Sequence, residues 1–330
     1  MSAAPRTYLA PLPVIREPGL EPAAIRAAHA RIDPVFTHSP QYVHEGLSAR
    51  LGVPVIVKIE TANPIRSFKG RGTSIAVGGL AGEGRIGPDR PVACVSAGNF
   101  GQGVAYASRA LGIPAIVFTS RHANRGKIAR MRALGANVIE VGEDFDEARD
   151  ASEAYALTHA VELLVDGEDP WTATGAATMA VEITDAVARG DLPEPFVTSV
   201  PVGNGALING IGSWLRAELS MCRVLGVQPE GAPAMTLSFR AGQPIDTPTA
   251  ETYADGIAAR IAIPEAVALM AGRIDDMILV SEGALHAAQD ELTAELGITV
   301  EGAAAASWAG VLAGPRPDGP VLVVITGSNV

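Results

Sequence analysis

The stretch Asn63-Pro64-Ile65-Arg66-Ser67-Phe68-Lys69-Gly70-Arg71-Gly72 contains one of only three lysines in this chain of 330 residues. A guanidinium cannot form an imine with an aldehyde at neutral pH, whereas a lysine amine that has lost its proton can. Lys58 lies in the apolar run 55–59, which predicts a buried strand, and Lys127 lies in a basic segment that predicts a solvated helix start. Lys69 is predicted to lie in a turn, after Phe68 and beside Gly70 and Gly72, which let a ligand approach the backbone. It is the candidate nucleophile.

The composition favours helices packed on parallel strands. Hydrophobic residues make up 48% of the chain but aromatic residues only 5%, so we expect a core of alanine, valine, isoleucine and leucine. The chain is long enough for two lobes. Its net charge of −11, without any block of lysine and arginine, excludes nucleic acid and anionic membrane surfaces as expected partners.

The cysteines and the N-terminus indicate a reducing compartment. Cys94 and Cys222 lie in apolar runs, as buried free thiols do, and no Cys-x-x-Cys pattern indicates zinc. The segment 1–6 leads into a proline-broken stretch without the apolar core of a signal peptide, and no window has the length of a membrane span without charges. We expect a cytoplasmic protein.

Short β-branched runs alternate with helical patterns, which predicts an α/β fold with parallel sheets covered by helices. The predicted strands are Val55–Ile59, Val92–Val95, Ala115–Phe118, Val138–Val141, Val197–Val200, Val224–Val227 and Val321–Ile325. The predicted helices are Gln102–Leu111, Lys127–Leu134, Ala177–Ala188, Ile208–Leu219 and Glu282–Leu296. Residues 91–167 are predicted to form a small inserted α/β domain, and residues 1–90 together with 168–330 a large domain.

Four loops with small and polar residues follow predicted strands, where α/β folds bind their ligands. One is the Lys69 segment. The segment 96–103, Ser-Ala-Gly-Asn-Phe-Gly-Gln-Gly, opens a helix and suits an anion such as a carboxylate. The segment 201–210, Pro-Val-Gly-Asn-Gly-Ala-Leu-Ile-Asn-Gly, again joins a strand to a helix and suits a phosphate. The segment 326–329, Thr-Gly-Ser-Asn, follows the last strand.

Any one of these loops could be an ordinary strand-to-helix turn, since glycine and serine are common there. A dinucleotide site is disfavoured, because Gly203, Gly205 and Gly210 do not have the Gly-x-Gly-x-x-Gly spacing. Gly126-Lys127 lacks the upstream glycine of a phosphate-binding P-loop.

Taken together, the four loops resemble fold-type II enzymes dependent on pyridoxal 5′-phosphate, in the threonine/serine dehydratase branch. That family is two-lobed, like the tryptophan synthase β-subunit. Ser67-Phe68-Lys69 resembles its Schiff-base lysine motif, and 96–107 its substrate-carboxylate loop. The segments 203–207 and 326–329 resemble its phosphate loop and its pyridine-nitrogen motif. Smaller matches are 254–258 and 300–303, and the resemblance covers roughly residues 35–330.

The resemblance implies a set of site residues. The catalytic residue is Lys69. The cofactor-binding residues are Phe68, Lys69, Asn99, Gly203, Asn204, Gly205, Ala206, Leu207, Gly256, Glu301 and Thr326. The substrate-binding residues are Ser96, Ala97, Gly98, Asn99 and Phe100. Ala97 stands where relatives that racemise serine have a serine, so we expect racemisation to be at most a side reaction. No metal is expected, because Gln228 replaces the glutamate that begins a cation site in several relatives.

The departures from the family pattern leave the reaction open. Phe100 stands where the family usually has histidine, and Asn204 and Ala206 replace two glycines of its phosphate loop. An asparagine at the second place is more typical of threonine synthases. The family's Gly-Gln-Gly-Thr ahead of a helix is Gly-Ala-Ala-Thr at 175–178, which removes a polar side chain near the substrate end.

The function implied by the resemblance is α,β-elimination from a β-hydroxy amino acid such as threonine or serine, giving a 2-oxo acid and ammonia. One alternative is β- or γ-replacement, as in threonine synthase-like or biosynthetic enzymes. Another is a non-catalytic amino-acid-binding protein on the same scaffold, which an intact Lys69 disfavours. The resemblance also implies a homodimer.

Overall fold

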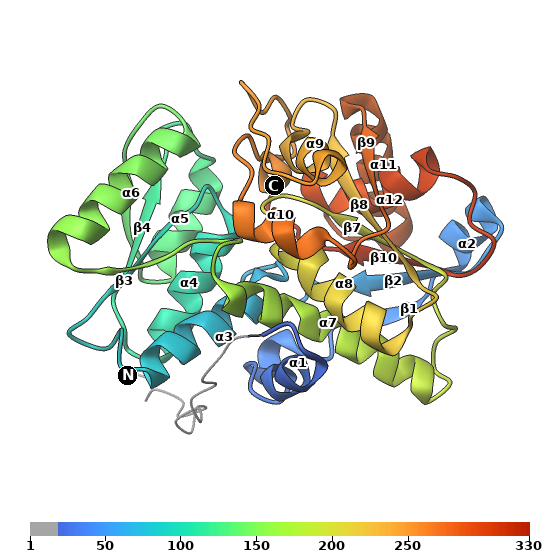
Figure 1. Cartoon of the computed structure of the whole chain (residues 1–330), viewed down its shortest axis with the longest axis horizontal. Coiled ribbons are helices and arrows are strands. Elements are labelled where there is room, and N and C mark those ends of the chain that lie inside the picture. Colours follow the sequence, from blue (N-terminus) through green and yellow to red (C-terminus); the bar gives the residue numbers. More distant parts are fainter. Residues whose placement is uncertain (1–18) are drawn as a thin grey trace.

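The computed structural model describes residues 19–330, and the elements within this range form two sheets with helices on both faces (Figure 1). The predicted α/β class is therefore confirmed. The N-terminal segment 1–6 and the first 18 residues of the predicted large domain lie outside the described residues. No helix within the described range combines the length and the apolar character that crossing a lipid bilayer requires.

The larger sheet has six strands, all parallel except the first, which pairs antiparallel with its neighbour. In spatial order they are β1 (Gln41–Val43), β2 (Val55–Ile59), β10 (Val321–Ile325), β7 (Val197–Pro201), β8 (Arg223–Pro229) and β9 (Asp276–Val280). Successive residues of β10 alternate between two apolar layers. Leu322 and Val324 pack on the side of α1 (Pro22–His29), α7 (Pro170–Ala188), α8 (Ala206–Glu218) and α10 (Pro264–Met270). Val321, Val323 and Ile325 pack on the side of α2 (Glu45–Leu51), α11 (Glu282–Leu296) and α12 (Gly302–Ala313).

The smaller sheet has four parallel strands. In spatial order they are β5 (Asn137–Glu140), β4 (Ala115–Thr119), β3 (Val92–Val95) and β6 (Glu162–Leu164). Val92 and Cys94 face α3 (Lys69–Gly82), α4 (Asn99–Ala110) and α5 (Arg125–Ala133), whereas Ala93 and Val95 face α6 (Phe145–His159). The remaining helical elements are η1 (Pro34–Phe36), α9 (Ala234–Ala241) and η2 (Asp255–Ile257).

The core of the smaller sheet extends beyond residues 91–167. Side chains of α3, including Val77 and Leu80, pack in the same apolar cluster as Val92 and Cys94. In Figure 1, α3 lies between the smaller sheet and α7. The two sheets therefore share helices at their junction, and the domain boundaries at 90/91 and 167/168 stay predictions.

All seven predicted strands exist, and the five predicted helices exist with some earlier starts, for example α7 at Pro170 instead of Ala177. The sequence analysis did not name the strands β1, β6 and β9, nor the helices α1, α2, α3, α6, α9, α10 and α12. The prediction that Lys69 lies in a turn is wrong, because Lys69 is the first residue of α3, with Phe68 as its N-cap residue.

Candidate active site

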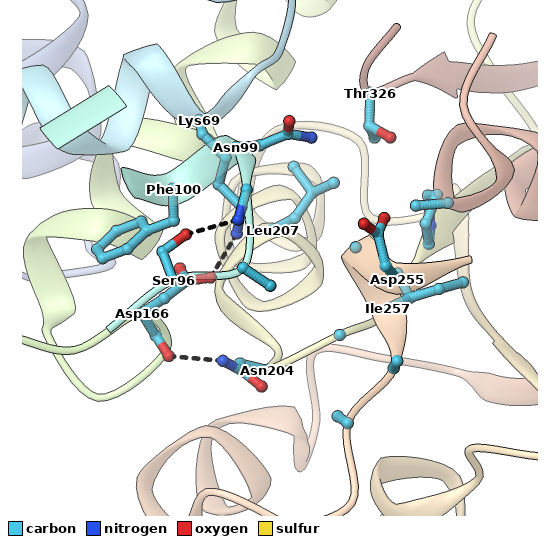
Figure 2. Close-up of a pocket in the computed structure, with 18 of the residues that line it drawn as sticks. Lys69, Ser96, Asn99, Phe100, Asp166, Asn204, Leu207, Asp255, Ile257 and Thr326 are labelled. Atoms are coloured by element: carbon cyan, nitrogen blue, oxygen red, sulfur yellow. Dashed lines mark hydrogen bonds and ion pairs between the residues drawn. The ribbon is translucent and has the colours of Figure 1, made fainter. Parts of the chain in front are cut away.

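All the predicted site residues line one pocket between the two sheets (Figure 2). The pocket lies where β2, β3, β7 and β10 end, so the four loops named from the sequence converge there. Further lining residues that are not among the predicted site residues are Lys127, Phe145, Asp166, Asp255, Ile257 and Ala259, with others of the same backbone segments.

Lys69 is held at the pocket by the end of β10. The Phe68 N–H donates to the Thr326 carbonyl at 3.0 Å, and the Ser328 N–H donates to the Arg66 carbonyl at 3.0 Å. These backbone bonds tie the segment before α3 to the pyridine-nitrogen motif predicted at 326–329. The Lys69 amine lies 2.6 Å from a carboxylate oxygen of Asp166 and 4.8 Å from the centre of the Phe68 ring.

The loop from Ser96 to Asn99 presents the start of α4 to the pocket. The Ser96 hydroxyl oxygen accepts hydrogen bonds from the backbone N–H groups of Gly98 at 3.1 Å and Gly101 at 2.8 Å, which shape the loop. The Ser96 hydroxyl hydrogen is still available to donate. A helix N-terminus together with a hydroxyl suits a carboxylate ligand.

The loop from Gly203 to Leu207 opens α8 and fits a phosphate. Gly205 has a φ of 95°, which favours glycine, and a Cβ added to Gly203 would lie 3.0 Å from the Gly256 carbonyl oxygen. Unpaired backbone N–H groups at a helix start are a common phosphate site. The Asn204 side chain instead donates to the Asp166 carbonyl at 3.0 Å, as Figure 2 shows, so its replacement of glycine leaves the backbone cradle intact.

Asn99, Glu301 and Asn329 form a buried hydrogen-bonded group beside the pocket. The Asn99 amide donates to the Glu301 carboxylate at 2.8 and 3.1 Å, and its oxygen accepts from the Asn329 amide at 2.8 Å. Burial raises the pKa of Glu301, against the opposing effects of the Lys127 charge and the Asn99 hydrogen bond. This group joins the start of α4 to the end of β10.

The prediction that Lys127 begins a solvated helix is wrong. Its side chain is only 4% exposed, and its amine contacts both oxygens of Asp255, at 2.7 and 2.5 Å. The methylene groups of Lys127 pack on the loop, because a Cβ added to Gly98 would lie 2.7 Å from its Cδ. A lysine stem can cover apolar surface while its amine reaches a distant carboxylate. Two of the three lysines therefore line the pocket, and each is paired with a carboxylate, Lys69 with Asp166 and Lys127 with Asp255.

Thr236 binds the side chain of Gln228, the residue at which no cation is expected. The Gln228 side-chain oxygen accepts hydrogen bonds from the Thr236 backbone N–H at 2.7 Å and the Thr236 hydroxyl at 2.9 Å, and the Gln228 side chain is fully buried. Glu230, the nearest acid in the segment, is exposed. Within residues 19–330 no group of three histidine, cysteine, aspartate or glutamate side chains could hold a metal ion.

We predict that EDTA changes neither turnover nor the melting temperature. A hard divalent cation prefers carboxylate oxygens, and the neutral Gln228 amide is already occupied by Thr236. The measurement is a melting curve with and without EDTA. A clear drop in melting temperature that Mg²⁺ or Ca²⁺ restores would show that a cation site exists with other ligands.

A lysine amine in a pocket at the carboxyl ends of parallel strands, with a helix start that suits a phosphate, is typical of a cofactor-dependent enzyme. The model of the "Pyridoxal-phosphate dependent enzyme" family matches residues 34–327. The chain belongs to this family, and its fold is fold type II.

Named relatives point to one branch of the family. The chain is 34% identical to the L-threonine ammonia-lyase of Thermotoga maritima over 285 residues, which cover 86% of this chain and 69% of the relative. It is 34% identical to the L-threonine dehydratase biosynthetic IlvA of Mycobacterium tuberculosis over 316 residues, or 94% of this chain and 72% of the relative. The crystal structure of the T.th. threonine deaminase is similar with a TM-score of 0.86 and 28% identity, covering 94% of this chain and 98% of that one.

Proposed function

We propose that the protein is a lyase that removes the β-hydroxyl group from threonine or serine, giving a 2-oxo acid and ammonia. The observation that carries the proposal is the pocket itself. It places the Lys69 amine beside the N-terminus of α4, which suits a carboxylate, and the N-terminus of α8, which suits a phosphate. The similarity to threonine dehydratases over most of the chain supports this choice of reaction.

The residues of the pocket fit pyridoxal 5′-phosphate. The cofactor supplies an aldehyde that binds amines covalently and a ring that takes up electrons when a Cα–H bond breaks. In our proposal Lys69 holds the aldehyde carbon, the backbone of Gly203–Leu207 holds the phosphate, and the Thr326 hydroxyl faces the ring nitrogen. Ser96 and the backbone of Gly98 and Asn99 hold the substrate carboxylate.

Lys69 is the proposed base. An amine that holds the cofactor and is then released next to the substrate Cα has the position and the chemistry to take the Cα proton. Phe100 is buried, and its ring centre lies 5.9 Å from the Lys69 amine, so this side of the pocket is apolar. An apolar wall excludes water from the reacting atoms.

Replacement chemistry is the second candidate. Phe100 and Asn204 are the residues that favour replacement, because dehydratases usually have a histidine and a glycine at these two positions. The Asn204 side chain contacts Asp166, not the pocket centre, which weakens that argument.

The test is an amino-acid panel with three readouts. We expect L-threonine or L-serine to give a 2-oxo acid and ammonia in equal amounts, without an added thiol or other nucleophile. A product that forms only when a nucleophile is present, with no 2-oxo acid, would establish replacement instead. Binding of amino acids without any product would establish a non-catalytic role.

We further propose a cytoplasmic homodimer with a small domain over residues 91–167. The two cysteines within the described range are free and buried, which suits a reducing compartment. Tyr42 and Val43 on the edge strand β1 are 41% and 38% exposed. Exposed apolar residues on the edge strand of a sheet are typical of an edge that another chain covers, which supports the dimer. Light scattering on the purified protein tests the dimer, since a monomer mass would exclude it.

A further inference from the structure

Asp166 is an acidic side chain at the pocket that the proposed reaction does not use. It follows β6, and one of its carboxylate oxygens lies 2.6 Å from the Lys69 amine. Its other carboxylate oxygen is buried without a hydrogen-bond partner among the described residues. A buried oxygen without a partner is unfavourable unless a ligand supplies the missing donor.

The backbone holds Asp166 firmly in place. The Asn204 amide donates to its carbonyl oxygen at 3.0 Å. The next residue, Gly167, has a φ of 95°, and a Cβ there would lie 2.7 Å from the Asn204 Cβ. The segment therefore packs directly on the loop predicted to bind phosphate. The carboxylate has a defined position relative to a bound cofactor and substrate.

Charge complementarity points to the substrate as the partner of Asp166. A base has to be neutral before it accepts a proton, so Lys69 offers Asp166 no ammonium at the stage when it acts on the substrate. Lys127 is the other lysine that lines the pocket within residues 19–330, and its amine is already paired with both oxygens of Asp255. Asp166 also borders an adjoining cavity lined by Arg149 and Arg260, but these arginines pair with Glu168 and Asp146. At that stage neither lysine of the pocket offers Asp166 an unpaired ammonium.

The substrate brings its β-substituent to the same place. Its amino group takes the position that the Lys69 amine leaves, and its Cβ lies two bonds further on. A group on Cβ is therefore within reach of a carboxylate that contacted the Lys69 amine at 2.6 Å.

We propose that Asp166 is a specificity-determining residue that binds the β-substituent of the substrate, an inference that rests on the proposed function. It favours a β-ammonium group over a β-hydroxyl group, and both over a carboxylate, because a carboxylate binds a cation more strongly than a neutral donor and repels an anion.

The β-ammonium substrate undergoes the same elimination. In L-2,3-diaminopropionate the Cα–H and Cβ–N bonds break, the electron pair of the Cα–H bond forms the Cα–Cβ double bond, and ammonia leaves. Lys69 takes the Cα proton, and a proton then adds to Cβ to form the methyl group. Addition of one water and release of the α-nitrogen then give pyruvate and a second ammonia. With serine, water leaves in place of the first ammonia, and neither reaction needs an oxidant or a reductant.

The test compares the wild-type holoenzyme with the variant Asp166→Asn, which keeps the shape of the side chain but not its charge. We expect kcat/KM for L-2,3-diaminopropionate to fall about 10- to 100-fold relative to that for L-serine, as expected for loss of a hydrogen bond to a charged group. In the same variant, kcat/KM for threo-3-hydroxyaspartate should rise relative to that for L-serine. Asp166→Glu should keep the wild-type order of substrates.

A second readout needs no turnover. L-2,4-Diaminobutyrate and L-homoserine carry the ammonium and the hydroxyl group one carbon further and have no leaving group on Cβ. Their dissociation constants, measured by calorimetry, should favour diaminobutyrate in the wild type, and Asp166→Asn should remove that preference. The control is Glu168→Gln, which removes an exposed charge two residues away that pairs with Arg149 at 2.6 Å.

The outcomes separate this inference from the proposed function. In Asp166→Asn, kcat/KM could fall equally for every substrate while the ratios of dissociation constants stay unchanged. That result would show that Asp166 acts only on Lys69 or on folding, and it would overturn the inference. Absence of a 2-oxo acid from all amino acids would overturn the proposed function, while the binding ratios would still decide the role of Asp166.

Discussion

Replacing Lys69 with alanine should lower turnover by at least about a thousandfold, because one residue both holds the cofactor and serves as the base. The variant should still bind pyridoxal 5′-phosphate without a covalent bond, since the cradle formed by Gly203–Leu207 is separate from the lysine. The measurements are kcat with the best substrate of the panel and the absorption spectrum of the bound cofactor.

Amine rescue separates a catalytic defect from misfolding. Added methylamine should restore part of the activity of Lys69→Ala, because a small amine can enter the space left by the side chain. Wild-type turnover by Lys69→Ala without any added amine would contradict the role of Lys69.

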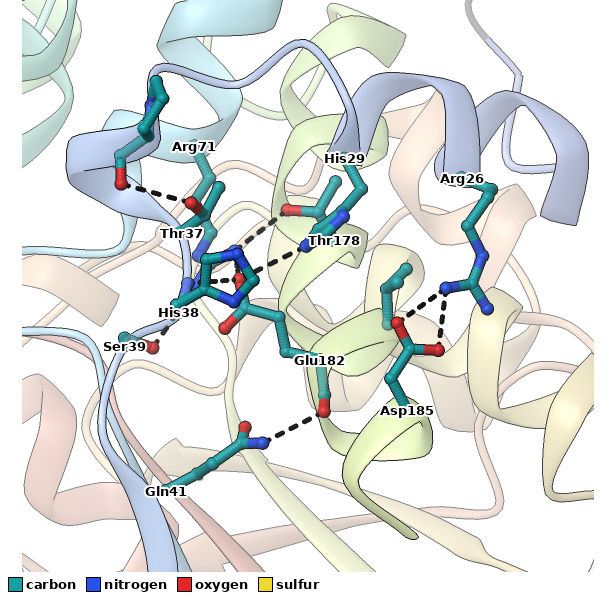
Figure 3. A network of polar contacts seen from close by, with 12 residues as sticks. Arg26, His29, Thr37, His38, Ser39, Gln41, Arg71, Thr178, Glu182 and Asp185 are labelled. Atoms are coloured by element: carbon teal, nitrogen blue, oxygen red, sulfur yellow. Dashed lines mark hydrogen bonds and ion pairs between the residues drawn. The ribbon is translucent and has the colours of Figure 1, made fainter. Parts of the chain in front are cut away.

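Replacing Glu182 with glutamine should destabilise the fold by about 3–5 kcal/mol, because it leaves buried positive charge without a partner. Glu182 lies on α7 and contacts the Lys58 amine at 2.5 Å. It also contacts the Arg71 guanidinium at 2.8 Å, and Figure 3 shows the network around these two residues. Arg71 also pairs with Glu60 at 2.8 Å, and the two basic side chains are fully buried. The network therefore balances two positive with two negative charges. The measurement is the free energy of unfolding of the apoenzyme in urea.

Asp185→Asn is the matched control for Glu182→Gln. Asp185 lies one turn after Glu182 on α7, and its carboxylate pairs with Arg26 at 2.7 Å. Both side chains are more than a third exposed. Exposed ion pairs contribute about 0–1 kcal/mol. Equal losses of unfolding free energy in the two variants would show that the buried network contributes no more to stability than an exposed ion pair does.

The Glu182 carboxylate also makes the stability of the fold depend on pH. Burial alone would raise the pKa of Glu182, but the hydrogen bond with His29 and the charge of Arg71 outweigh it and hold the pKa well below its usual range. A depressed pKa in the folded state stabilises the protein above the unfolded value of about 4.3, and this stability is lost as the pH falls below it. Glu182→Gln should therefore show a flatter loss of stability in acid than the wild type.

The parts of the molecule that could be predicted from sequence are those with local signals. Continuous apolar runs such as 92–95 and 321–325 gave strands, and small polar residues after them gave the pocket loops. Parallel strands of one sheet end at the same edge, which brings together the loops after β2, β7 and β10. The loop after β3 belongs to the smaller sheet, and its meeting with the others depends on how the two sheets pack. The strands β1 and β6 have only three residues each, too few for a periodic pattern.

The parts that could not be predicted depend on contacts between distant residues. Lys127 looked solvated because its neighbours are basic, but its partner Asp255 lies 128 residues further along the chain. Asp166 follows the short strand β6, and its contact with Lys69 spans 97 residues. Glu182 did carry a local signal, because it is an acid between the apolar residues Val181 and Ile183 of a largely buried helix, which indicates a buried ion pair.

Peptide mapping of the enzyme after borohydride reduction tests the central claim most directly, because reduction fixes the cofactor to the lysine that holds it. Lys127 is the informative competitor, since it lines the same pocket, whereas Lys58 is enclosed in the Glu182 network. We predict that mass spectrometry finds the pyridoxyl group on Lys69 alone. A pyridoxyl group on Lys127, with Lys69 unmodified, would contradict the account.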